Sequence, residues 1–190
     1  SPGSYTLQSE TIDDAAGEAF DKGARILGLK YPGGPEIDRL SKTGNCDKFK
    51  FPRPKVKSSK FNFSFSGLKT ALLYKHKELN ENNIKYKNED LAASYQEAIV
   101  DTLIDRIIKV SESTQVKTVS IAGGVAANSR FRDKAQNILF KKQINFFFPK
   151  MEYCTDNAAM IAYTAYHKSK TCDYSSISTM ADPNLSLADV

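Results

Sequence analysis

The sequence predicts an α/β fold, and three features of the residue pattern support this prediction. Up to about residue 113, apolar residues recur at helical spacing. From Thr118 to Lys168, strand patterns alternate with helix patterns, which is typical of parallel strands joined by crossover helices. Only two to four strands are visible. Because a complete nucleotide-binding domain has more strands, we expect part of such a domain to be missing.

The helical part begins with a predicted helix over residues 13–29, whose start Thr11 or Asp13 can cap. This helix ends before Tyr31–Pro35, because a helix cannot continue through two prolines and two glycines. A short helix over residues 36–42 is expected to follow.

The next stretch, residues 43–60, is rich in Gly, Asn, Ser, Pro and Lys, which predicts an irregular, exposed and basic segment. Phenylalanines then alternate with polar residues over 61–65, the period of a half-buried strand. A helix is expected from Ser66 to about Leu79. The longest helix pattern runs from Glu89 to about Ser113, with apolar residues on one face and Asn88 as its cap.

The remaining elements form a strand–helix–strand–helix unit. Strands are predicted over residues 118–122 and 144–148, and helices over 128–140 and 155–168. A strand, a crossover helix and a second strand imply a parallel pair with a right-handed connection. The tail, 172–190, shows little periodicity and is expected to be extended.

Composition places the chain among ordinary globular proteins. It has 190 residues, of which 41% are hydrophobic and 26% charged. No apolar run approaches the roughly 20 residues that span a bilayer. The three cysteines have no CxxC spacing, which argues against a disulfide framework or a zinc ribbon and fits a reducing cytoplasm. The net charge of +5 favours polyanionic partners, although a merely basic surface would give the same value.

The clearest local motif is Ser120–Arg130, in which a strand pattern runs into two glycines and small residues and then opens a helix. Glycines let the backbone approach a ligand, and a helix N-terminus offers free N–H groups and a positive dipole. This favours a nucleotide site, but the spacing is not GxGxxG, so a dinucleotide is not indicated. The alternative is a tight turn in which Asn128 only caps the helix.

Three other features allow two interpretations each. The glycines of Tyr31–Pro35 can serve a ligand or simply end a helix, and Asp21 can bind a ligand or remain a solvated carboxylate. Thr155 or Asp156 can cap the last helix, or Asp156 can bind a metal ion. One carboxylate does not make a metal site, since a catalytic metal takes about three protein ligands.

Six segments, taken together and in this order, resemble the TsaD family of tRNA N6-adenosine threonylcarbamoyltransferases, formerly called glycoproteases or O-sialoglycoprotein endopeptidases. The segments are Asp13–Lys22, Tyr31–Pro35, Phe51–Pro54, Phe63–Thr70, Ala122–Asn128 and Cys154–Asn157. The resemblance covers nearly the whole chain. It implies an actin-like, Hsp70-like ATPase (ASKHA) fold of two lobes, of which this chain matches the second.

The resemblance also implies a domain organisation. Residues 1–170 would form the C-terminal lobe, with a helical part over about 11–113 and the βαβα part over about 117–169. Residues 171–190 would be an extended tail, and the N-terminal lobe would lie outside this sequence.

The family's site residues carry over onto matching positions. Asp21, Gly34 and Asn128 would contact the nucleotide part of the substrate, and Gly123 and Gly124 would form the adjoining turn. The ligand implied is threonylcarbamoyl-adenylate, or ATP or AMP.

Asp156 would be the carboxylate ligand of one divalent metal ion, iron or zinc. The family's other ligands are two histidines spaced HxxxH, and this sequence has no such pair. The family's phosphate-binding glycine loop is absent too. We therefore expect no catalysis from this chain alone.

The activity implied for the whole protein is transfer of threonylcarbamoyl to N6 of adenosine 37 in tRNAs that read codons beginning with A. Its partners would be tRNA and the TsaB-like and TsaE-like accessory proteins of bacteria, in the cytoplasm and without a membrane. The alternative is a non-catalytic module that binds a nucleotide or a partner. A peptidase is disfavoured, since no nucleophile–base pair and no HExxH motif occurs. The lysine-rich segment 48–60 is either a tRNA-contacting surface or a solvated loop.

Overall fold

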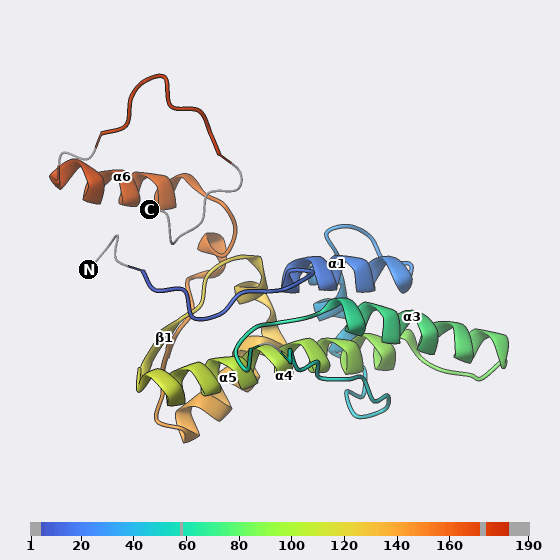
Figure 1. Cartoon of the computed structure of the whole chain (residues 1–190). Helices are drawn as coiled ribbons and strands as arrows, with labels where there is room; N and C mark the ends of the chain where they lie inside the picture. Colours follow the sequence, from blue (N-terminus) through green and yellow to red (C-terminus); the bar gives the residue numbers. More distant parts are fainter. Residues whose placement is uncertain (1–4, 58, 172–173, 183–190) are drawn as a thin grey trace.

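The computed structural model describes residues 5–57, 59–171 and 174–182 (Figure 1). Within them lie six α-helices, two short 3-10 helices and one parallel sheet of two strands, so the predicted α/β class is confirmed. The helices are α1 (Ala16–Ile26), α2 (Gly33–Ser41), α3 (Ser66–Glu81), α4 (Asn88–Thr114), α5 (Ser129–Lys141) and α6 (Ala158–Lys170). The strands are β1 (Thr118–Ser120) and β2 (Asn145–Phe147), and the 3-10 helices are η1 (Gly124–Ala127) and η2 (Met151–Tyr153).

Helix α4 is the central element, and α1, α2, α3 and α5 all pack against it. Residues 91–100 are buried without interruption. The helix is therefore covered on all sides there, whereas the sequence predicted one apolar face. As a result, polar side chains of α4 such as Gln96 and Glu97 are also buried.

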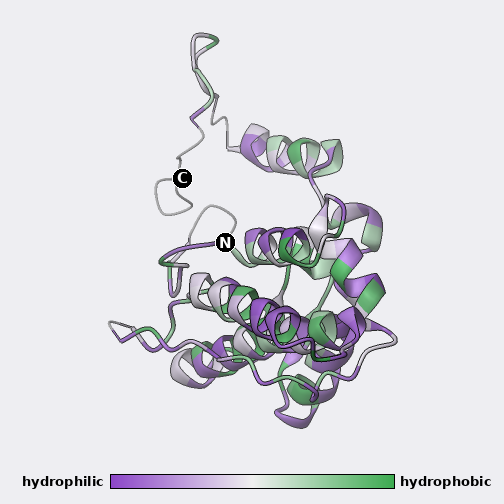
Figure 2. Ribbon diagram, turned by 90° about the vertical axis from the view of Figure 1, so that its right-hand side faces the viewer, coloured by the Kyte–Doolittle hydropathy of each residue, from purple (hydrophilic) through white to green (hydrophobic). Residues whose placement is uncertain are grey.

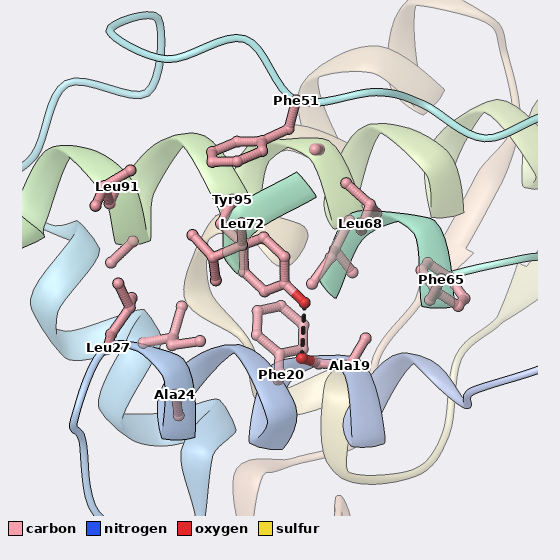
Figure 3. Close-up of a cluster of buried hydrophobic side chains, with 14 of the residues drawn as sticks. Ala19, Phe20, Ala24, Leu27, Phe51, Phe65, Leu68, Leu72, Leu91 and Tyr95 are labelled. Atoms are coloured by element: carbon pink, nitrogen blue, oxygen red, sulfur yellow. Dashed lines mark hydrogen bonds between the residues drawn. The ribbon is translucent and has the colours of Figure 1, made fainter. Parts of the chain in front are cut away.

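An apolar cluster fills the space between α1, α3 and α4 (Figure 3). Its largest fully buried members include Phe20, Phe65, Leu68, Leu72, Leu91 and Tyr95. The Tyr95 hydroxyl donates a hydrogen bond to the Ala19 carbonyl at 2.8 Å, which satisfies the one polar atom of this buried ring. A Cβ at Gly23 would lie 2.3 Å from the same ring, so the glycine makes room for Tyr95.

A second apolar cluster joins α4 and α5 to the sheet. Its buried members are Val100, Ile104, Phe131, Ala135, Leu139 and Ile144. β1 and β2 pair in parallel with Val119 opposite Phe146, and α5 lies between them in the chain. The predicted βαβα unit and its parallel pairing are thus confirmed.

Helix α1 is shorter than the predicted helix over 13–29, because the residue expected to cap it serves another helix. Ala15 precedes α1 without a side-chain hydrogen bond to the helix. The Asp13 carboxylate instead accepts hydrogen bonds at the start of α3, more than 50 residues further along the chain.

This long-range cap is formed by both carboxylate oxygens of Asp13. Oδ1 accepts from the Phe65 amide at 2.7 Å, and Oδ2 accepts from the Ser64 and Ser66 hydroxyls at 2.6 and 2.8 Å. Burial by itself would raise the pKa of Asp13, but these hydrogen bonds outweigh it and the pKa lies below its usual value. The contact fixes the entrance to α1 against the start of α3.

Two further predictions are corrected in this region. Helix α2 begins at Gly33, inside the Tyr31–Pro35 turn, because proline is tolerated in a first helical turn, where its missing N–H needs no partner. Residues 61–65 form no strand. Phe63 makes a single parallel bridge to Thr11, with an Ile12 N–H to Phe63 O hydrogen bond of 3.0 Å.

The caps of α4 and α6 also differ from the predictions. Asn88 is the first residue of α4 and does not cap it. Helix α6 begins at Ala158, and its cap is Asn157, whose Oδ1 accepts from the Met160 amide at 3.2 Å. Of the tail, residues 174–182 contain no helix or strand, while 172–173 and 183–190 lie outside the described residues.

Helix α6 stands clear of the other helices in Figures 1 and 2. None of its residues is buried, and Ile161, Tyr163 and Tyr166 expose more than half of their surface. Its apolar residues appear green in Figure 2. A search of the described helices finds none that combines the length and the apolar character needed to span a bilayer.

Candidate nucleotide site

A cavity of about 430 Å³ lies where α1, α2 and the β1–α5 connection meet. Residues from four segments line it: Gly17, Phe20 and Asp21 of α1; Pro32, Gly34, Pro35, Asp38, Arg39 and Lys42 of the α2 region; Gly124, Val125, Ala127 and Asn128; and Met151 and Thr155. Four of the five predicted substrate-binding residues are therefore brought together, although they are up to 107 positions apart in the sequence. The fifth, Gly123, directly precedes this lining.

Asp21 links α1 to the start of α2. Its Oδ1 accepts a hydrogen bond from the Gly33 amide at 2.7 Å, so the carboxylate caps α2 across a gap of 12 residues. The structure prints no hydrogen bond to the second oxygen within the described chain, and the side chain is half-buried in the cavity wall. Asp21 thus builds the cavity with one oxygen and can meet a ligand with the other.

The N-terminus of α5 is already occupied by protein groups. Asp38 accepts from the Ser129 amide at 3.2 Å and from its hydroxyl at 2.8 Å. Asn128 Oδ1 accepts from the Phe131 amide at 2.8 Å. The expectation that this helix end offers free amides is therefore wrong for Ser129 and Phe131, because a carboxylate from α2 reaches it.

Asn128 is a cap, as one of the two sequence interpretations had it. Its side-chain amide also donates to Gln96 Oε1 at 2.7 Å, and both residues are buried. With Oδ1 and Nδ2 both engaged, Asn128 presents the rest of its surface to the cavity and holds the connection against α4. A role for it in nucleotide binding acts through this placement.

The glycine turn supplies the unoccupied amides. Gly123 has a φ of +86°, a conformation that favours glycine. The first amide bonded within the turn is that of Ala126, which donates to Gly123 O at 2.9 Å. The amides of Gly124 and Val125 precede it, so of the groups described here these two remain for an anionic ligand.

Two lining residues of α2 escaped the sequence interpretation, although a signal for them exists. Gly34, Asp38 and Lys42 are four residues apart, which places them on one helical face toward the cavity. Gln96 had no such signal, because it becomes important only where α4 and α5 touch.

A smaller cavity of about 260 Å³ adjoins the first, and Asp38 and Lys42 line both. Its wall includes Glu97, whose carboxylate accepts two hydrogen bonds from Arg130, at 2.7 and 2.8 Å, and one from Lys134. Burial would raise the pKa of Glu97, but these two cations lower it to about 2. The ion pairs fasten α5 to α4 directly behind the nucleotide site.

The predicted metal ligand lies beside the cavity. Asp156 is exposed, one residue beyond the lining residue Thr155. In the described part of the chain, no group of three His, Cys, Asp or Glu residues is arranged to hold a metal ion. The residues present do not fit a complete metal centre by themselves.

Comparison with known proteins agrees with this site. The family model described as "TsaD: tRNA N6-adenosine threonylcarbamoyltransferase" matches residues 1–163. A protein of that name from Thermosipho africanus is 52% identical over 94% of this chain and 53% of its own length. Another from Caldicellulosiruptor saccharolyticus is 50% identical over 96% of this chain and 54% of its own.

The chain spans about half the length of these curated relatives. The matched residues include all those that line the nucleotide cavity. Both the α/β architecture and the glycine turn agree with the actin-like lobe that this family implies. The chain therefore belongs to the TsaD family, tRNA N6-adenosine threonylcarbamoyltransferase.

Proposed function

We propose that the whole protein transfers a threonylcarbamoyl group from threonylcarbamoyl-adenylate to N6 of adenosine 37 in tRNAs that read codons beginning with A. The observation that carries this proposal is the single cavity lined by Asp21, Gly34, Gly124 and Asn128, in a chain of this family. The cavity holds backbone amides for a phosphate and carboxylates for hydroxyl groups. Such a site can bind an adenylate and hold it in one orientation.

The chemistry is attack by the adenine amine on a mixed anhydride, with AMP as the leaving group. The amides of Gly124 and Val125 would bind the phosphate of the adenylate, where negative charge grows as AMP leaves. The free oxygen of Asp21 would accept a hydrogen bond from a sugar hydroxyl of the adenylate.

Replacing Asp21 by asparagine in the full-length protein tests this site. Asparagine keeps an oxygen for the Gly33 amide, so folding should be unchanged, but it removes the charge at the ligand. A hydrogen bond to a charged group is worth about 1.5–3 kcal/mol, so transfer at low substrate should fall roughly 10- to 100-fold. The measurement is formation of threonylcarbamoyladenosine on tRNA, with urea unfolding as the check on folding.

The matched control is Asp47→Asn, an exposed carboxylate outside the cavity, which should transfer at the wild-type rate. Wild-type transfer by the Asp21 variant would remove Asp21 from the ligand site. A full-length protein that binds AMP but modifies no tRNA would favour the non-catalytic binding module instead.

We propose that Asp156 supplies one ligand to an iron or zinc ion whose remaining ligands lie outside this chain. Bound there, the metal would polarise the reacting group and orient it. Asp156→Ala in the full-length protein should lower the metal content per mole of protein, while the stability of the cavity is kept because Asp156 is exposed. Metal analysis after dialysis measures this, and unchanged metal content would contradict the assignment.

The proposal extends to organisation and partners. Residues 1–170 would form the C-terminal lobe, with a helical part over 11–113 and a βαβα part over 117–169. The exposed apolar side of α6 supports a further lobe in the whole protein, since such a surface is normally covered. TsaB-like and TsaE-like proteins in the cytoplasm would be its partners.

A further inference from the structure

The positive charge of the chain is concentrated in one segment. Six of the 27 lysine and arginine residues lie between Lys48 and Lys60, and no acidic residue lies there. The other 21 basic residues face 22 acidic ones, so the rest of the chain has a net charge of −1, although the whole has +5. A generally basic surface does not explain this distribution. We call the segment 48–60 the basic strip.

The backbone of the basic strip is held against α4, although it forms neither helix nor strand. The Phe49 amide donates to Ser94 Oγ at 3.1 Å, and the buried Phe51 ring meets Tyr95 edge-on at 5.9 Å (Figure 3). Further along, the buried Arg106 donates to Pro54 O at 3.0 Å. These contacts distinguish the strip from a solvated loop.

The cations of the strip point away from this anchored side. Six basic side chains are exposed along it: Lys48, Lys50, Arg53, Lys55, Lys57 and Lys60. Arg53 pairs with Asp101 at 2.6 Å, and Lys60 lies over the Phe61 ring at 4.8 Å. The other four lysines form no ion pair with any residue whose placement is described. Their charges are therefore available to an outside polyanion.

The strip begins beside the nucleotide site. Lys42 lines both cavities, and Cys46, two residues before the strip, lines the smaller one. We propose that the basic strip binds the phosphate backbone of the tRNA whose adenosine is modified at this site. This inference rests on the proposed function. Lysine is suited to the task, because it meets phosphates as a point charge without reading the base sequence.

Neutralising the strip in the full-length protein tests the inference. The strip variant carries Lys48→Gln, Lys50→Gln, Lys55→Gln and Lys57→Gln. The control variant loses the same charge at four exposed lysines elsewhere, through Lys77→Gln, Lys85→Gln, Lys87→Gln and Lys141→Gln. The Kd for tRNA is measured over a series of salt concentrations, together with the Kd for AMP.

Each lost phosphate contact lowers the salt dependence of log Kd by roughly 0.7 to 0.9, so the strip variant should lose about 3 from this slope. At physiological salt its Kd for tRNA should rise about tenfold or more. The control should keep the wild-type slope, and both variants should bind AMP as the wild type does.

An equal slope for the two variants would overturn the inference and leave the proposed function standing. A wild-type protein that binds no tRNA would overturn both. If the strip variant kept its tRNA affinity but lost binding to vesicles with anionic lipids, the strip would be a membrane-facing surface and the RNA assignment would be wrong.

Discussion

Gly33→Ala is expected to destabilise the full-length protein by about 2–3 kcal/mol and to abolish AMP binding. A Cβ at this position would lie 2.6 Å from the Ala24 Cβ and 2.7 Å from the Asp21 Cα. Both atoms belong to the body of α1, so the methyl group can be admitted only if α1 and α2 move apart. That movement would break the Asp21–Gly33 hydrogen bond and deform the cavity between the two helices.

The neighbouring glycine is a matched control for this prediction. A Cβ at Gly34 would have Phe20 Cβ as its nearest neighbour, at 4.0 Å, which is ordinary contact. Because Gly34 is also helical, Gly34→Ala should leave stability unchanged or raise it by up to about 1 kcal/mol. Urea unfolding of both variants measures the difference. Equal free energies of unfolding would show that the α1–α2 contact is looser than described.

Glu97→Gln is expected to cost about 2–3 kcal/mol at pH 7 and to change the acid sensitivity of the protein. The carboxylate is buried and holds Arg130 and Lys134 of α5. Removing its charge leaves both cations without their shared partner. The expected loss lies at the lower end for buried pairs, because Arg130 itself is partly exposed.

The pH dependence follows from the lowered pKa of Glu97. Its pKa is about 2 in the folded protein and 4.5 in the unfolded chain, so between these values the unfolded state binds more protons. The stabilisation is therefore complete above about pH 5 and is lost as the pH falls toward 2. This loss amounts to about 3 kcal/mol in the wild type and should be absent from Glu97→Gln.

Unfolding in urea at pH 7 and near pH 3 measures both effects. Glu112→Gln provides the control, since Glu112 pairs with Lys142 on the surface and both side chains are exposed. That variant should lie within about 0.5 kcal/mol of the wild type at either pH. An acid sensitivity of Glu97→Gln equal to that of the wild type would place the titrating group elsewhere.

Local patterns in the sequence were sufficient for most elements of the fold. The alternation from Thr118 to Lys168 predicted both strands, both helices and their parallel pairing. The reason is that strand and helix periods are local properties, and a parallel pair needs a crossover that the helix pattern supplies. The caps were predicted less well, since Asp13 serves α3 and Asn157 replaces Thr155 or Asp156.

The sequence by itself determined the α/β class, the glycine turn and the identity of the residues that line the cavity wall at Asp21, Gly34 and Asn128. Only the tertiary structure decided how these residues are used. Asp21 caps α2, Asp38 occupies the end of α5, and Gln96 holds Asn128. Each of these contacts joins side chains from separate helices. A hydrogen bond between them depends on how α1, α2, α4 and α5 pack, and no local pattern records that packing.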